Sequence, residues 1–268
     1  MNNKKSIWIS FIVYVTLFLI ICLLVKDKTN KPQLAWLLLQ AYSFLISIKL
    51  LKNYKFPKKN QLFHALIYTF IYSLSTIQYF ELYSLVQIIL FFIGVCAVIS
   101  TINKEKIGEI RFLKNTDLKS IIITIVIGII VGIIFGGINY LLMMNNNEIN
   151  NSNLISAFFL SLNPALGEEI LYRTVFYVLV ISTIKNNKKG KFLCWFMMIV
   201  PHVVPHTTDC FNNNFVSSLI TWPIYLLLYS LIFGFIFALL QKKRDITSAM
   251  IAHGIVDFIR FYIYGIPM

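Results

Sequence analysis

Apolar stretches alternate with short polar segments along the whole chain of 268 residues. Each apolar stretch holds about 20 residues, enough for a helix to cross the roughly 30 Å of hydrocarbon in a bilayer. The pattern therefore predicts an all-α fold, a polytopic transmembrane helical bundle of eight or nine spans. We place the spans near residues 6–25, 33–51, 61–80, 84–102, 120–144, 165–184, 192–206, 217–240 and 247–264.

The composition agrees with a membrane protein, since 58% of the residues are hydrophobic and the mean hydropathy is +0.74. The polar segments are too short to fold by themselves, so we expect a single membrane domain over residues 1–268, with accessory N-terminal helices in 1–119 and a core in 120–268. Within the fifth span, Gly128, Gly132 and Gly136 repeat at four-residue spacing. Such spacing predicts that another helix approaches closely there.

The formal net charge of +13 arises mostly from clusters of lysine and arginine in alternate loops. By the positive-inside rule these loops are cytoplasmic, which places the N-terminus in the cytoplasm. Lys26, Lys28 and Lys31 do not follow the pattern. Anionic membrane lipids are sufficient partners for this charge, so no nucleic-acid partner is expected. A chain so rich in Asn, Lys and Ile suggests a bacterial plasma membrane. The cationic clusters lie at residues 4–5, 52–59, 104–119, 185–191 and 242–244.

Two adjacent carboxylates and a guanidinium stand in the apolar sequence after Asn163: Glu168, Glu169 and Arg173. An ionisable side chain at bilayer depth costs about 2.5–3.5 kcal/mol on insertion scales, so such residues usually mark a functional site. Residues four apart share a helix face, so Glu169 should pair with Arg173. Glu168 then points about 100° away and is free to act as a general acid or base. We also expect a helix to start at Asn163, with Pro164 in its first turn.

Two later spans carry further polar residues in apolar surroundings. His202 and His206 accompany Pro201 and Pro205, which should kink the seventh span and admit water. In the last span His253 and Asp257 share a face, and Arg260 can pair with Asp257. A Glu–Arg pair or a single histidine could serve only to hold helices together. The accumulation of all these groups in three late spans favours a functional site instead, with His206 and Arg260 as its least certain members.

The order of these motifs resembles the CAAX protease and bacteriocin-processing (CPBP, or Abi) family of intramembrane proteases, to which the type II CAAX prenyl endopeptidases belong. Glu-Glu-x-x-x-Arg, a histidine at a helix end and His-x-x-x-Asp follow one another over about residues 150–260. The resemblance implies a CPBP-like catalytic core in the C-terminal half. By that comparison Glu168, His202, His253 and Asp257 are catalytic, and Glu169 and Arg173 support them.

The chain departs from the family pattern at two positions. Met198 stands where the second motif usually has Phe, although a register ending at His206 instead of His202 is also open. Asp257 stands where the family more often has Asn, and a carboxylate cannot donate a hydrogen bond unless it is protonated. If the family's Asn contributes to an oxyanion hole, Asp257 must be neutral or must be paired with Arg260.

The resemblance implies hydrolysis of a peptide bond in a membrane-associated peptide or lipidated protein, in bacteriocin immunity or peptide-pheromone processing. We expect Glu168, assisted by His202, to activate a water molecule, and His253 with Asp257 to stabilise the oxyanion. No cofactor or metal is expected in this mechanism. The alternative is zinc held by Glu168, His202 and His253. Two other classes of function stay open, namely a non-catalytic membrane scaffold or regulator and a proton-coupled transporter.

Overall fold

The fold was examined in a computed structural model, which describes residues 3–77, 80–144, 149–184, 188–212 and 215–265. The described segments are helical and contain no strand, which confirms the all-α prediction. In chain order the helices are α1 (Asn3–Leu24), α2 (Asn30–Tyr54), α3 (Lys59–Leu74), α4 (Leu82–Glu105), α5 (Leu118–Met143), α6 (Leu154–Leu162), η2 (Asn163–Thr174), α7 (Val175–Ile184), α8 (Lys188–Val203), η3 (Val204–Phe211), α9 (Phe215–Tyr229), η4 (Ser230–Gly234), α10 (Phe235–Lys243) and α11 (Ile246–Tyr264).

Seven helical stretches in the described residues are long and apolar enough to cross a membrane. Two of them are composite, because α6, η2 and α7 run on as one 31-residue stretch and α9, η4 and α10 as one 29-residue stretch. The expected spans 61–80 and 192–206 correspond to α3 and α8, which have 16 residues each. The chain is an integral, multi-pass membrane protein, and every expected span is represented by a helix.

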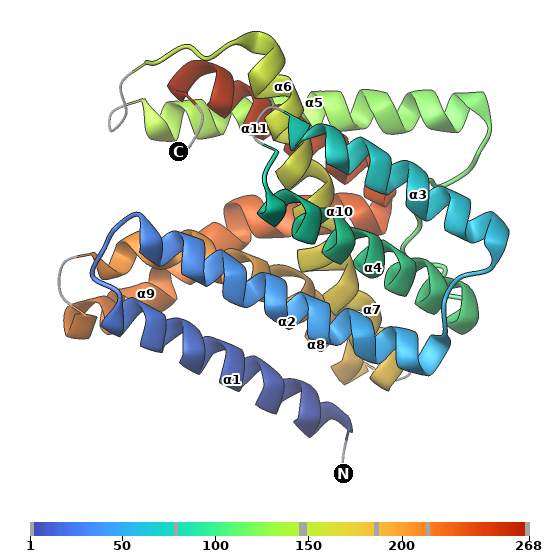
Figure 1. Cartoon of the computed structure of the whole chain (residues 1–268), viewed down its shortest axis with the longest axis horizontal. Helices are drawn as coiled ribbons and strands as arrows, with labels where there is room; N and C mark the ends of the chain where they lie inside the picture. The colour runs from blue at the N-terminus through green and yellow to red at the C-terminus, as the bar shows by residue number, and fades with distance from the viewer. Residues whose placement is uncertain (1–2, 78–79, 145–148, 185–187, 213–214, 266–268) are drawn as a thin grey trace.

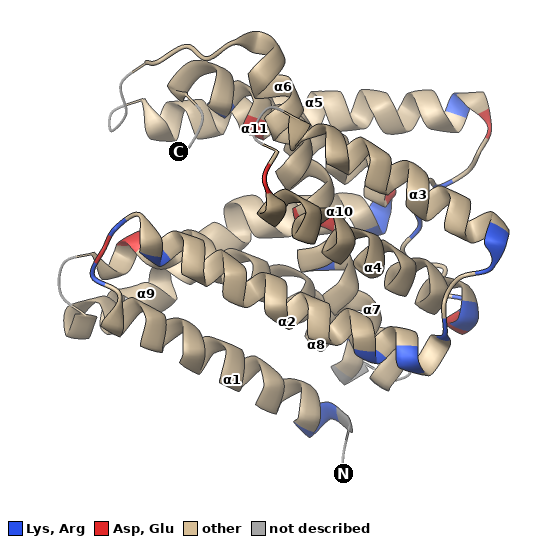
Figure 2. Ribbon diagram, viewed as in Figure 1, with Lys and Arg blue, Asp and Glu red and all other residues tan. Residues whose placement is uncertain are grey.

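The helices are arranged around the composite stretch α6–η2–α7, which crosses the middle of the molecule (Figure 1). The α1 and α2 helices lie along one side, and α5 lies along the opposite side, where it packs on α11 (Figure 1). The buried residues of η2 and α7 contribute to a large apolar core shared with α1, α2, α4 and α8. Lysine and arginine are concentrated at helix ends and in loops, as Figure 2 shows.

Three glycines of α5 allow its close packing on α11, as their spacing predicts. A Cβ atom on Gly128 would lie 2.8 Å from Ile251, and one on Gly132 would lie 2.7 Å from Ile255. On Gly136 it would lie 2.5 Å from Ile259. Any larger side chain on this face would push the two helices apart.

The expected helix start at Asn163 is wrong. The helix begins at Leu154 and is capped by Asn153, whose side chain accepts hydrogen bonds from the amides of Ile155 and Ser156. Pro164 therefore lies inside a continuous helix, where it cannot donate a backbone hydrogen bond. The helix adopts the wider π form over Asn163–Thr174. In this form each hydrogen bond joins residues five apart instead of four, so the pattern of bonds changes around the proline. Glu168 and Glu169 thus lie in mid-helix, away from the positive helix end.

The expected irregularity at Pro201 and Pro205 is present. The α8 helix ends at Val203 and continues as the 3₁₀ helix η3. Pro205 has no amide hydrogen for the Pro201 carbonyl four residues earlier, and the Tyr14 hydroxyl donates to that carbonyl instead, at 3.0 Å. Lys31, an exception to the charge pattern, is buried and donates to the Phe211 carbonyl at the end of η3. These contacts hold the end of α8 against α1 and the end of η3 against α2.

Candidate functional site

The residues singled out in the sequence come together from three separate parts of the chain. Glu168, Glu169 and Arg173 lie on η2, whereas the other members come from α8, η3 and α11. The predicted convergence of Glu168, His202 and His253 is found in the structure. Arg260 and His206 lie at the edge of this cluster, with side chains 38% and 34% exposed.

Glu168 is surrounded by three histidines. Its Oε2 atom is hydrogen-bonded to Nε2 of His202. Nε2 of His253 lies 3.6 Å from the same oxygen, and Nε2 of His206 lies 3.8 Å from it. The Glu168 side chain keeps 14% of its surface exposed, which makes it the more accessible of the two adjacent carboxylates. Glu168 is therefore the carboxylate that an incoming substrate or water can reach.

Glu169 is fully buried and uses both of its oxygens in hydrogen bonds. Oε1 accepts from Nε of Arg173 at 3.0 Å and faces Nδ1 of His253 at 2.7 Å. Oε2 accepts from Nε2 of Gln241 at 2.6 Å. The predicted Glu169–Arg173 pair is confirmed, and Arg173 also donates to the Gly234 carbonyl at 2.8 Å. Glu169 therefore ties η2 to α11, and it reaches α10 through Gln241.

Gln241 is a member of the cluster that the sequence did not reveal. It is fully buried, donates to the side chain and the carbonyl of Glu169, and accepts from the Thr174 hydroxyl at 2.9 Å. Gln241 lies in the last turn of α10, beside Lys242 and Lys243. A polar residue is ordinary at such a helix end, so the sequence alone does not mark it as part of a site. No spacing within α10 links it to Glu169, because the contact is between elements 72 residues apart.

His253 lies between two carboxylates. Nδ1 faces Glu169, and Nε2 lies 3.2 Å from Oδ2 of Asp257. A neutral imidazole can donate from only one ring nitrogen, so two carboxylate neighbours favour the doubly protonated imidazolium. Its ring stacks on Phe237 at 4.6 Å, which fixes its orientation. In its protonated form His253 would place a positive charge 3.6 Å from Oε2 of Glu168.

Asp257 has His253 as its near partner, and Arg260 is more distant. Nη1 of Arg260 lies 4.0 Å from Oδ1 of Asp257, at the limit of an ion pair. The expected alternatives for Asp257 were a neutral acid or pairing with Arg260. In the structure the nearer partner of Asp257 is His253, one turn away on the same helix face.

His202 and His206 differ in their surroundings. His202 is 3% exposed, and its Nδ1 atom has no hydrogen-bond partner among the described residues. His206 is more open and meets the edge of Trp36, at 4.9 Å between ring centroids. Of the two motif registers, the one with His202 puts the histidine in direct contact with Glu168. Met198, which replaces the motif's Phe, is completely buried in the core.

One group of residues in the cluster could hold a metal ion, and it shares two of its three members with the expected zinc set. Ligand atoms of Glu168, His202 and His206 all lie within 4.8 Å of one another. One carboxylate and two imidazoles are a usual set of protein ligands for catalytic zinc. His253, a member of the expected set, has both nitrogens facing other carboxylates and offers no free lone pair. In the structure His206 takes the place that His253 has in the expected zinc set.

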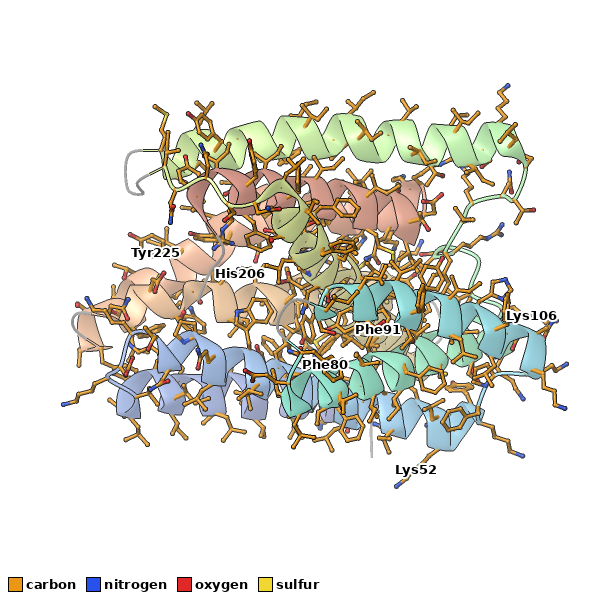
Figure 3. The ribbon with its side chains drawn as sticks, turned by 45° about the horizontal axis from the view of Figure 1, so that its top comes forward. Lys52, Phe80, Phe91, Lys106, His206 and Tyr225 are labelled. Atoms are coloured by element: carbon orange, nitrogen blue, oxygen red, sulfur yellow. The ribbon has the colours of Figure 1, made fainter. Side chains whose placement is uncertain are left out.

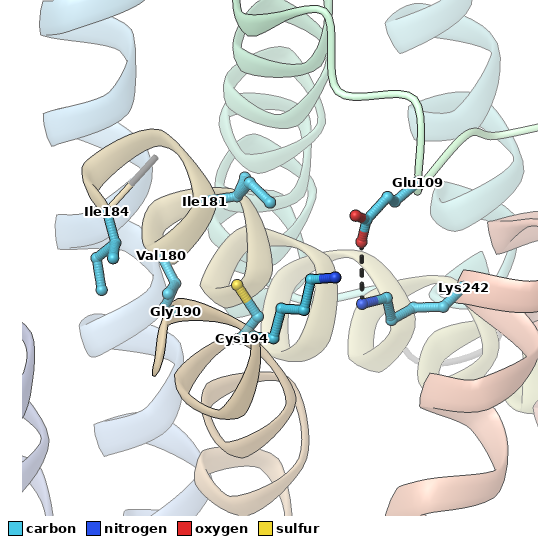
Figure 4. Close-up of a pocket in the computed structure, with 8 residues that line it drawn as sticks. Glu109, Val180, Ile181, Ile184, Gly190, Cys194 and Lys242 are labelled. Atoms are coloured by element: carbon cyan, nitrogen blue, oxygen red, sulfur yellow. Dashed lines mark ion pairs between the residues drawn. The ribbon is translucent and has the colours of Figure 1, made fainter. Parts of the chain in front are cut away.

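A second polar cluster lies apart from this site. Glu109 forms an ion pair with Lys242 at 3.1 Å (Figure 4). It also accepts a hydrogen bond from the Tyr177 hydroxyl at 2.9 Å. Partial burial alone would raise the pKa of Glu109, but the hydrogen bonds from Lys242 and Tyr177 lower it below the ordinary value. The adjoining cavity, beside Cys194, has a volume of about 10 Å³, room for at most one water molecule. The cluster connects the loop after α4 to α7 and α10 and is too tight for a substrate.

The fold and the site define a class, namely an integral membrane protein with a buried glutamate–histidine cluster between its helices. Residues 150–259 match the family model of the type II CAAX prenyl endopeptidase Rce1-like proteins. This match confirms the resemblance inferred from the motifs, and it supports a membrane endopeptidase. It includes all the candidate residues named above except Arg260. Comparisons with curated proteins and with solved structures found no match.

Proposed function

We propose that the chain is an intramembrane endopeptidase in which Glu168 is the general base. The observation that carries the proposal is the pairing of Glu168 with His202 beside a second histidine, His253, which lies between two other carboxylates. The substrate is a membrane-associated peptide or a lipidated protein. The resemblance favours bacteriocin immunity or peptide-pheromone processing as the setting. The composition favours a bacterial plasma membrane, and the positive loops favour a cytoplasmic N-terminus.

The proposed reaction begins with a water molecule beside Glu168. The carboxylate removes a proton while the water oxygen bonds to the peptide carbonyl carbon. His202, hydrogen-bonded to the same carboxylate, helps to hold this proton and pass it to the leaving nitrogen as the C–N bond breaks. The products are a carboxylic acid and an amine, so atoms and charges balance.

His253 stabilises the charge that develops on the carbonyl oxygen. A fixed cation near a developing oxyanion lowers the transition state more than the ground state. Glu169 and Asp257, on opposite ring nitrogens, favour its protonated form and hold its plane. In this arrangement Asp257 acts through His253, and its own negative charge is offset by the imidazolium.

Zinc dependence is the second candidate, favoured by the grouping of Glu168, His202 and His206. These three residues would hold the ion, which when bound supplies Lewis-acid activation of water. The buried, unpartnered Nδ1 of His202 is compatible with either form, since Nε2 is the nitrogen that faces Glu168.

The test is hydrolysis of a lipidated peptide by the purified chain in detergent, followed by mass spectrometry of the fragments. Wild type, Glu168→Gln and His206→Ala are compared with and without a zinc chelator. Loss of activity in Glu168→Gln, with resistance to the chelator and to His206→Ala, supports the metal-free reaction. Chelator sensitivity that zinc reverses would favour the metal form, and equal turnover by Glu168→Gln would refute both.

A further inference from the structure

A groove with a volume of about 610 Å³ lies between the start of α3, the end of α4 and the following loop. Gln61, His64 and Tyr68 line it from one face of α3, and Ile99, Ile102 and Asn103 from one face of α4. The loop residues from Lys106 to Thr116 close its third side. None of its lining residues belongs to the candidate active site, so the groove needs a separate explanation.

The floor of the groove is apolar. Ile99, Ile102 and Ile107 line it, together with the rings of Tyr68 and Phe112, whose centroids are 4.8 Å apart. A floor of this kind favours an apolar chain over a fully hydrated solute. The lower part of the groove is therefore suited to hydrocarbon.

The rim of the groove is cationic. Lys106 and Arg111 line it, and His64 adds a ring nitrogen that can donate. No carboxylate is among the lining residues. Within the described part of the chain neither Lys106 nor Arg111 forms an ion pair. Lys106 is the residue that directly follows α4, and its φ of 51° is uncommon for residues other than glycine. The rim thus presents two unneutralised positive charges to one opening.

The loop that carries Arg111 and Phe112 is held in place by α11. The Ile246 amide donates to the Arg111 carbonyl at 2.9 Å, and the Thr247 amide donates to the Phe112 carbonyl at 3.1 Å. The Lys114 amide donates to the Asp245 side chain at 3.1 Å. A wall fixed by these bonds is formed before any ligand arrives, which reduces the entropy cost of binding.

The groove lies beside the N-terminal end of α3 and the C-terminal end of α4. Lys106 is found at the same end of the molecule as Lys52 in the preceding hairpin (Figure 3). Cations near the surface of an anionic leaflet attract phosphate headgroups, and basic pockets between helices bind such headgroups specifically. A ligand with a phosphate above and an acyl chain below matches both the rim and the floor.

We propose that this groove binds an anionic glycerophospholipid, with its phosphate at Lys106 and Arg111 and an acyl chain on Ile99 and Ile102. Charge complementarity selects the headgroup, since a zwitterionic lipid would bring its own cation to a rim that is already positive. The site is independent of the proposed peptidase reaction and is expected whether or not the chain is catalytic.

The experiment is native mass spectrometry of the full chain titrated in detergent with phosphatidylglycerol, phosphatidylcholine or inorganic phosphate alone. Lys106→Gln combined with Arg111→Gln removes the rim charge. The matched control is Lys52→Gln combined with Lys59→Gln. It removes two cations from the end of α2 and the start of α3, and neither residue lines the groove. Asn103→Trp fills the groove and leaves both rim cations in place. Size-exclusion profiles verify that each variant is folded.

We expect the rim variant to bind phosphatidylglycerol about thirtyfold more weakly, as the loss of two surface cations predicts. Asn103→Trp should also weaken binding, whereas the control pair should not. Phosphatidylcholine should bind more weakly than phosphatidylglycerol to the wild type. The proposal is overturned if the rim and control variants behave alike, if the two lipids bind equally, or if inorganic phosphate binds as tightly as the lipid.

Discussion

Glu168 and Glu169 are neighbours in the chain but occupy different environments. Glu169 is fully buried, and its two oxygens are engaged by Arg173, His253 and Gln241. Glu168 is partly exposed, and its side-chain partners among the described residues are histidines, which can give up or accept protons. A carboxylate held by an arginine and a glutamine, which do not titrate, serves to hold helices together, whereas a carboxylate among histidines can exchange protons with them. From this comparison we propose a structural role for Glu169 and a chemical role for Glu168.

The sharpest way to break this comparison is to neutralise Glu168. Glu168→Gln should reduce peptide hydrolysis by about 10²–10⁴-fold, the usual contribution of a general acid or base. Its thermal unfolding in detergent should stay close to that of the wild type, because the amide still fits among the histidines. A large fall in unfolding temperature together with the lost turnover would show that Glu168 is structural as well.

Glu169→Ala should produce the opposite result. It leaves Arg173 buried without its carboxylate, and breaking a buried ion pair typically costs about 3–5 kcal/mol. We expect a marked fall in the yield of folded protein and in the unfolding temperature. The same measurement on Arg173→Ala is the matched comparison, and wild-type stability in both variants would contradict the assignment.

Gln241→Met tests the partner that only the structure reveals. It keeps the volume but leaves an oxygen of Glu169 without its donor, which costs about 1–3 kcal/mol for a buried group. The unfolding temperature should fall by less than in Glu169→Ala. Gln241→Glu would bring a second carboxylate to Glu169 and should be worse than Met, so the reverse order would argue against this hydrogen bond.

Much of the site could be predicted because it depends on local spacing. The Glu169–Arg173 pair follows from the four-residue repeat of a helix, and the glycines of α5 predict close packing in the same way. The contact between His253 and Glu169 could not be predicted, since it depends on how α11 is placed against η2. The helix start was missed because the π form tolerates Pro164 inside the helix.

Asp257→Asn examines whether the charge of Asp257 is needed beside His253. The amide oxygen can still accept from Nε2 of His253, so the position of the ring is kept. We expect hydrolysis at neutral pH to be preserved within about tenfold, a smaller effect than the loss of a general base. Asp257→Ala, which removes the acceptor, is the control and should lose more activity. Abolished turnover in a folded Asp257→Asn protein would mean that Asp257 is required as an anion.

Glu109 offers a third environment, a carboxylate that is 41% exposed and paired with Lys242 outside the core. An ion pair of this kind contributes about 0–1 kcal/mol, so Glu109→Gln should lower the unfolding temperature only slightly at neutral pH.

The pKa of Glu109 is lowered in the folded protein, so the contribution of Glu109 to stability is present above its unfolded pKa of about 4.3 and is lost as the pH falls through its folded pKa. The difference between wild type and Glu109→Gln should therefore close on acidification. If the difference in unfolding temperature between wild type and Glu109→Gln persists below the folded pKa, the Glu109 side chain acts through packing. The contrast between Glu109 and the buried Glu169 would then not be one of charge.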